Sequence, residues 1–193
     1  MELKALNFDR YRHWVSDARG KLESDPVHSF ISGWIAFNHY YGTYAVEYRE
    51  SLLKWTNDRK PRDKKQWLFL MQREDFQHYF EGFKKREPDV LDTQLALPVE
   101  SILHRTLVPE GLKPGSYRLA DLSALQIFES LYQIRNNLFH GSKDPGRSER
   151  DLGLATSAAT FMASFLEDLR LNTSGEVHDA YDPDVLSKYP KRF

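Results

Sequence analysis

Apolar residues recur every three or four positions through several long segments of this 193-residue chain, and this spacing limits the possible folds more than any other feature. It places the apolar side chains of each segment on one face of an α-helix. The pattern predicts long helices at 7–23, from 26 through Tyr44, at 63–85, from 121 or 123 to 139, and at 149–171. We therefore expect an all-α protein, an antiparallel helical bundle of four to five long helices.

The second of these helices has an unusually clear start and an unusually apolar surface. Asp25-Pro26 is typical of a helix N-cap followed by proline at the first helical position. The helix then continues through large apolar residues around most of its circumference: Phe30, Trp34, Phe37, Tyr41 and Tyr44. A helix with so little polar surface is usually buried in a core or in a subunit interface.

The helical pattern fails between residues 88 and 120, where prolines and glycines interrupt it repeatedly. This segment is predicted to be an irregular insertion, with one short helix within 95–103 and an extended stretch at 117–119. The C-terminal segment 173–193 is polar and contains two prolines, so it is expected to be irregular. The organisation is thus one helical domain over residues 1–172 and a polar tail over 173–193.

Composition excludes several classes of function. The chain has no cysteine, which rules out a disulfide scaffold, a thiolate nucleophile and cysteine-based metal sites. The histidines show no metal-ligand spacing, and we expect neither a metal nor a cofactor. A net charge of −1 argues against non-specific coating of nucleic acid, so any such role must depend on a local patch or pocket. Without a signal-peptide pattern or an apolar run of about 20 residues, a cytoplasmic location away from membranes is expected.

The segment Arg135-Asn-Asn-Leu-Phe-His140 carries the chemically informative residues. Arg135 falls near the carboxyl end of a predicted helix, and His140 falls at its last turn, immediately before Gly141. This string resembles the signature of the HEPN superfamily, in which an arginine, often followed by a small polar residue, precedes a histidine by a few positions. Trp34-Ile-Ala-Phe-Asn38 also resembles the aromatic-rich second helix of such proteins. The resemblance spans roughly residues 7–171, apart from the insertion.

The resemblance implies a metal-independent endoribonuclease of a toxin–antitoxin or anti-phage defence system, in which the ribose 2′-hydroxyl attacks its own phosphate. Histidine titrates near neutral pH, so His140 is the candidate for proton transfer. The guanidinium of Arg135 matches phosphate oxygens. Asn136 is the candidate for orienting the histidine or holding a phosphate oxygen, and Lys143 is a candidate RNA contact.

The geometry of one helix separates the two main candidates. Arg135 and His140 are about 140° apart around an ideal helix, so they reach one phosphate only if the last turn unwinds or a second subunit contributes. HEPN proteins commonly dimerise through these helices with both motifs facing a shared cleft. We therefore expect a homodimer that acts on RNA, with an antitoxin or another defence-system protein as a further partner.

Simpler interpretations of the same residues remain open. Arg135 lies on an apolar stripe and needs an anion or a carboxylate, which Glu129 or Asp121 would supply as a structural ion pair. His140 would serve equally as a C-cap that contacts the last helical carbonyls. For the whole chain, the alternatives are a catalytically silent HEPN module that binds RNA or a partner protein, and a structural dimerisation domain.

A second arginine–histidine pair and a basic run lie outside the motif. Arg73 and His78 have the same spacing, but no asparagine follows Arg73 and no helix break follows His78, which indicates a chance match. The basic run at 59–65 is a candidate for attracting RNA, although such runs are more often solvated loops and helix starts.

Overall fold

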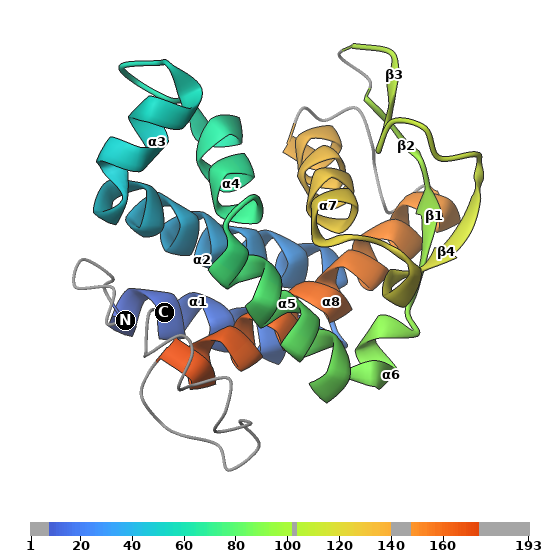
Figure 1. The fold of residues 1–193 in the computed structure, drawn as a ribbon. Coiled ribbons are helices and arrows are strands. Elements are labelled where there is room, and N and C mark those ends of the chain that lie inside the picture. The colour runs from blue at the N-terminus through green and yellow to red at the C-terminus, as the bar shows by residue number, and fades with distance from the viewer. Residues whose placement is uncertain (1–7, 102–103, 140–147, 174–193) are drawn as a thin grey trace.

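The computed structural model describes residues 8–101, 104–139 and 148–173, which are predominantly helical as predicted (Figure 1). None of the helices in these ranges is long and apolar enough to cross a membrane. The helices are α1 (Phe8–Lys21), α2 (Pro26–Glu47), α3 (Arg49–Thr56), α4 (Asp63–Met71), α5 (Glu74–Arg86), α6 (Pro88–Leu91), α7 (Ala124–Phe139) and α8 (Glu149–Thr173), with a 3-10 turn at Leu119–Asp121.

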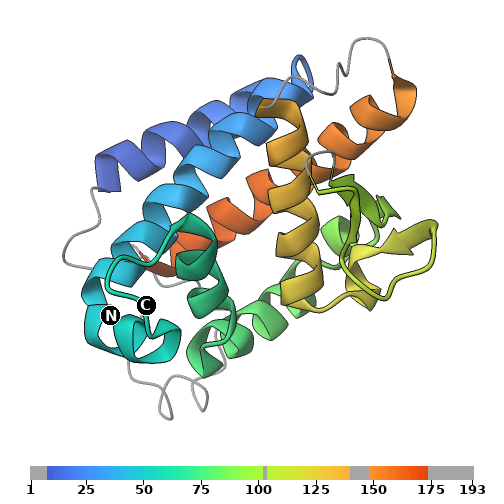
Figure 2. The same cartoon turned by 90° about the horizontal axis from the view of Figure 1, so that it is seen from above.

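Helix α2 lies at the centre of the molecule and packs against α1, α4 and α8. Its predicted start is confirmed, because the Asp25 carboxylate accepts a hydrogen bond of 3.0 Å from the backbone N–H of His28. Gly33 allows the close approach of α2 to α8, since a Cβ there would lie 3.1 Å from the Cβ of Met162. Figure 2 shows α1 alongside α2, and α7 crossing α8.

Phenylalanines from four helices form the part of the core that fixes α7. The ring of Phe128 on α7 stacks on Phe37 of α2, with 4.7 Å between their centroids. It also meets Phe165 of α8 edge-on at 5.3 Å, and Phe80 of α5 at 6.3 Å. Each of these side chains is fully buried. Edge-to-face and offset-stacked aromatic pairs add to the stability gained from burial alone, so α7 is held firmly near its middle.

The helix predicted over 63–85 is wrong in one respect, because the structure has two helices there, α4 and α5. The break occurs at Arg73, whose backbone is extended. Its guanidinium Nε donates to the Tyr44 hydroxyl at 3.1 Å and lies 3.6 Å from the Asp75 carboxylate. These contacts favour the break. The one with Tyr44 comes from another part of the chain, so the local apolar spacing does not indicate it. The short helix α3 was also not predicted.

The insertion is more regular than expected and contains two antiparallel strand pairs. Strand β1 (Gln94–Leu97) pairs with β4 (Gly115–Arg118), and β2 (Val99–Ser101) pairs with β3 (Thr106–Val108). The short helix predicted within 95–103 is therefore wrong. Within β1 and β2, Leu95, Leu97, Val99 and Ser101 are buried while Gln94, Ala96 and Glu100 are more exposed, which is the period-two burial of strands rather than helical spacing.

Side chains of α7 and α8 tie these strands to the helices. Asn137 donates from Nδ2 to the Glu100 carbonyl at 2.9 Å, and Ser157 donates to the Gln94 carbonyl at 2.9 Å. Both bonds satisfy backbone carbonyls that the strand ladders leave free. The β2–β3 pair is consequently held beside the carboxyl-terminal half of α7, as the ribbon shows (Figure 1).

Candidate functional site

The structure describes two of the four residues singled out from the sequence. Arg135 and Asn136 lie on the last two turns of α7. His140 and Lys143 lie outside the described residues, so their placement relative to Arg135 stays a prediction.

A capping box defines where α7 begins. The backbone N–H of Gln126 donates to the Ser123 hydroxyl at 3.2 Å, and the backbone N–H of Ser123 donates to the Gln126 side-chain carbonyl at 2.9 Å. The pair satisfies two of the donors that every helix start leaves unpaired. With its start capped and Phe128 locked in the core, α7 presents its last turns in a defined orientation.

Arg135 is half-buried and has an incomplete set of partners. Its Nη1 donates to the Asn136 side-chain carbonyl at 2.9 Å, and its Cζ lies 4.7 Å from the centroid of the Phe139 ring. Its Nε is buried and has no hydrogen-bond partner among the residues that the structure describes. A buried donor left unpaired costs on the order of 1–3 kcal/mol, so the described part of the protein leaves this donor open to a ligand.

The structural ion pair considered for Arg135 is absent from the part of the chain that the structure describes. Asp121 instead pairs with Arg118, with 3.2 Å between a carboxylate oxygen and Nε. Glu129 forms no ion pair with Arg135. A half-buried guanidinium without a carboxylate is best satisfied by an external anion such as phosphate.

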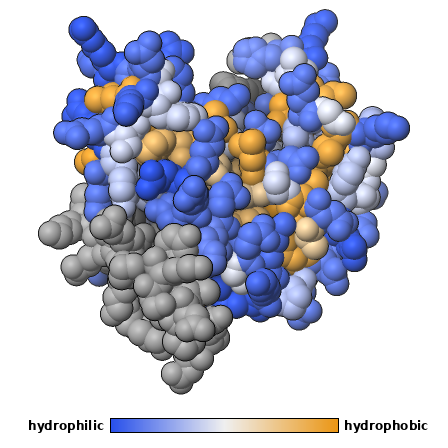
Figure 3. All heavy atoms as spheres, in the orientation of Figure 1, coloured by the Kyte–Doolittle hydropathy of each residue, from blue (hydrophilic) through white to orange (hydrophobic). Residues whose placement is uncertain are grey.

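Arg135 opens onto a large cleft of about 1320 Å³ between α4, α7 and the β2–β3 pair. In Figure 3 the surface is hollowed at the top, between the projection that contains α3 and α4 and the one that contains the β2–β3 pair. Trp67 of α4 and Tyr132 of α7 line the cleft with their rings 5.5 Å apart. The indole Nε1 of Trp67 is a second buried donor without a partner.

Charged groups of both signs line this cleft. Lys64 and Arg105 contribute positive charge from α4 and from the loop before β3. Glu110 and Glu129 contribute carboxylates. Burial raises the pKa of Glu129, and Glu110 adds to the increase, whereas Lys64 opposes it. With Arg135, the lining therefore has three permanent cations against two carboxylates, in a chain whose net charge is −1.

A buried tyrosine beside this site connects Arg135 to the start of α4. Tyr41 is fully buried, and its hydroxyl donates to the Asp63 carboxylate. Burial and the Asp63 contact raise the pKa of Tyr41 far above its usual value, and the positive charge of Arg135 partly opposes this increase. The tyrosine thus stays neutral and acts as a fixed polar support beneath the cleft.

The second asparagine of the motif, Asn137, was not singled out from the sequence and has a structural role. It is buried, accepts a hydrogen bond of 2.7 Å from Gln133 and donates to the Glu100 carbonyl. Lys64 and Arg105 were missed as cleft residues too. The basic run at 59–65 gave a signal for the former, but the sequence gave none for the latter, because only the fold brings the β2–β3 pair to α7.

The similar spacing of Arg73 and His78 leads to a different environment. The Arg73 guanidinium pairs with Asp75 and lies over the rings of Tyr48 and Phe69 at 5.2 and 5.9 Å. Its hydrogen bond to Tyr44 completes a set of internal partners. The structure therefore separates Arg73, which is satisfied within the protein, from Arg135, which is not.

Comparison with known proteins identifies no relative. No family model matches the chain, and no curated protein or solved structure matches it either. Within residues 8–101, 104–139 and 148–173, no three His, Asp or Glu side chains are grouped so that they could hold a metal ion.

Proposed function

We propose that this chain is a metal-independent endoribonuclease resembling the HEPN superfamily, and that Arg135 binds the scissile phosphate. The observation that carries this proposal is the half-buried guanidinium of Arg135, which opens onto a cleft with more cations than carboxylates and, among the described residues, has neither a carboxylate nor a partner for Nε. Phosphate oxygens supply both the negative charge and the hydrogen-bond acceptors for such a group.

The chemistry assigned to the motif needs no group from outside the protein and its substrate. The ribose 2′-oxygen attacks the adjacent phosphorus and loses its proton, and the 5′-oxygen leaves and gains one. The products are a 2′,3′-cyclic phosphate and a 5′-hydroxyl. His140 is the proposed proton-transfer residue. Arg135 would stabilise the charge that develops on the phosphate. Asn136, which binds Nη1 of Arg135, is assigned to positioning that guanidinium.

The finer features of the resemblance belong to the same proposal. They are an antiparallel arrangement of the long helices, a homodimer with both motifs at a shared cleft, and a cytoplasmic role in a toxin–antitoxin or anti-phage defence system with a partner protein. A twofold dimer would supply two copies of His140, which would divide the acid and base roles.

The test is cleavage of a labelled RNA, with the 2′,3′-cyclic phosphate end identified by mass spectrometry. We expect activity in EDTA, and a loss of about 100-fold or more in His140→Ala and Arg135→Gln, both of which should keep the circular dichroism spectrum of the wild type. His78→Ala is the matched control at the similarly spaced pair and should cleave like the wild type.

Two outcomes would overturn the ribonuclease assignment. One is cleavage by His140→Ala at the wild-type rate, and the other is cleavage that EDTA abolishes and magnesium restores. A folded wild type that binds RNA at the cleft without cutting it would instead favour the catalytically silent binding module, which the cationic lining supports independently of His140.

A further inference from the structure

Two cations of the cleft, Lys64 and Arg105, lie outside the HEPN-like motif and line the cleft from elements other than α7. Lys64 belongs to the first turns of α4, and Arg105 belongs to the loop that precedes β3. The fold therefore places three cations from three distant segments around one hollow, with Arg135 as the third. A cleft lined in this way concentrates an anionic polymer even on a protein without net positive charge.

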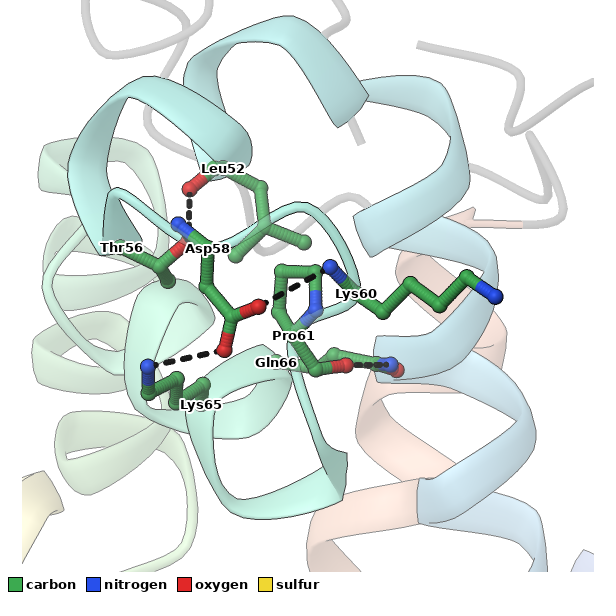
Figure 4. Close-up of polar contacts among 7 residues, drawn as sticks. All are labelled: Leu52, Thr56, Asp58, Lys60, Pro61, Lys65 and Gln66. Carbon is green, nitrogen blue, oxygen red and sulfur yellow. Dashed lines mark hydrogen bonds and ion pairs between the residues drawn. The ribbon is translucent and has the colours of Figure 1, made fainter.

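The loop in front of α4 holds Lys64 toward the cleft by fixing its neighbours. The Asp58 carboxylate accepts hydrogen bonds of 3.0 Å from the backbone of Lys60 and from the ammonium of Lys65, and Gln66 donates to the Pro61 carbonyl at 2.9 Å (Figure 4). Lys65 is thus paired with Asp58 and does not line the cleft, whereas the adjacent Lys64 does. These two lysines differ in orientation and partner but not in charge.

Arg105 occupies its position at a conformational cost. Its φ of 53° lies in the left-handed region, which glycine adopts without strain and arginine does not. The backbone N–H of Arg105 donates to the Ser101 carbonyl at 2.6 Å, which closes the turn whatever the side chain. The turn itself therefore gives no reason for an arginine, and strain of this kind is concentrated at functional sites.

Phe139 provides an aromatic surface beside the phosphate-binding guanidinium. Its side chain is 53% exposed, which is high for a phenylalanine, and Arg135 covers only one of its faces. An unpaired base stacks readily on such a ring, whereas a base within a duplex is already stacked on its neighbours. The cleft volume also exceeds the roughly 300–1,000 Å³ of sites for small molecules, so it suits several linked nucleotides.

Building on the proposed function, we propose that this cleft binds RNA as an unpaired single strand. Lys64, Arg105 and Arg135 contact successive phosphates. Phe139 stacks on one base, which selects single-stranded over double-stranded RNA.

The test measures binding without cleavage by the full chain. The probe is a fluorescein-labelled strand of about 12 nucleotides, within the range one such groove binds, with 2′-O-methyl riboses that lack the attacking hydroxyl. Fluorescence anisotropy gives Kd for this strand and for the same strand annealed to its complement. The variants are Lys64→Gln, Arg105→Gly and Phe139→Leu, and Lys65→Gln is the control of equal charge change.

We expect the two cleft variants, Lys64→Gln and Arg105→Gly, and Phe139→Leu beside the cleft each to raise Kd at least about fivefold, and Lys65→Gln to change it less than about twofold. Lys64→Gln and Arg105→Gly should each lower the slope of log Kd against log salt by about 0.7. Arg105→Gly should keep or slightly raise the melting temperature, because it removes backbone strain. The annealed duplex should bind at least about fivefold more weakly than the single strand.

Equal losses in Lys64→Gln and Lys65→Gln, equal affinity for duplex and single strand, or no binding of the strand by the wild type would each overturn this proposal. The two proposals fail separately. Cleavage of RNA by cleft variants at the wild-type rate and affinity would remove the single-strand cleft and leave the ribonuclease intact. Binding that follows the expected pattern without any cleavage of ordinary RNA would overturn the ribonuclease assignment and leave the single-strand cleft intact.

Discussion

Three consecutive polar residues at the end of α7 have three different environments, although they look alike in the sequence. Arg135 opens onto the cleft, its Nε has no partner among the described residues, and its Nη1 donates to the side-chain carbonyl of Asn136. Asn137 is turned into the protein, where it bonds to Gln133 and to the backbone of β2. The helix rotates by about 100° per residue, so neighbours in the sequence face different surroundings. Asn137 also borders the cleft, but its side chain is buried and held by partners within the protein.

We predict effects of different size on stability for the two asparagines. Asn137→Ala should lower the free energy of unfolding by about 1–3 kcal/mol, because it leaves the Glu100 carbonyl and the Gln133 amide without their partner in a buried place. Asn136→Ala should change stability by less than about 0.5 kcal/mol, since its site is half-buried and reaches water. Urea unfolding measures both, and equal losses would contradict the assigned roles.

Arg73 shows why spacing alone does not define a site. It stands five positions before a histidine, as Arg135 does, yet its guanidinium is satisfied by Tyr44 and Asp75 and by nearby rings. What distinguishes an arginine that binds a ligand is the set of partners left vacant, and this depends on residues far away in the chain.

Some elements are determined by the local sequence, and others by contacts with distant parts of the fold. Helices α1, α2, α7 and α8 begin and end close to the predicted positions, because apolar periodicity and capping residues act locally. The division between α4 and α5 and the strands β1, β2 and β3 were not predicted, because they depend on contacts with α2, α7 and α8. The extended stretch predicted at 117–119 overlaps β4 and is confirmed in part.

The capping box at the start of α7 should contribute measurably to stability. Ser123→Ala should lower the free energy of unfolding by about 1 kcal/mol, because the Ser123 hydroxyl caps the N–H of Gln126. Ser123→Thr keeps a hydroxyl at the same place and should stay within a few tenths of a kcal/mol of the wild type. Chemical denaturation compares the two, and equal losses would show that the capping box contributes nothing.

In the molecule as a whole, one of the two sequence features that suggested a dimer is accounted for within a single chain. The apolar surface of α2 packs within the chain, against α1, α4 and α8, and so does not itself call for a second subunit. The remaining reason is the divergence of Arg135 and His140 around one ideal helix. Exposed Phe139 and Leu107 are compatible with either a partner or a ligand at this end of the molecule.

We predict a homodimer in solution, since one catalytic centre would then receive residues from both subunits. Sedimentation velocity at tens of micromolar should give about twice the 22.6 kDa of the chain. Arg135→Gln mixed with His140→Ala should recover part of the activity that each variant lacks alone, because a mixed dimer keeps one Arg135 and one His140 at the shared cleft. A single species of chain mass that still cleaves RNA would contradict a composite site.

Local sequence patterns specify the predominantly helical class, most boundaries of the long helices, and the position of Arg135 and Asn136 near the end of α7. These depend on periodicity, capping and helix geometry, which act over a few neighbouring residues. The tertiary structure alone decided the strands of the insertion, the break at Arg73 and the inward role of Asn137. It also decided that Lys64 and Arg105 share a cleft with Arg135. Most of these features depend on contacts between distant segments, such as Asn137 with Glu100 and Arg73 with Tyr44, and no local pattern encodes which segments will meet.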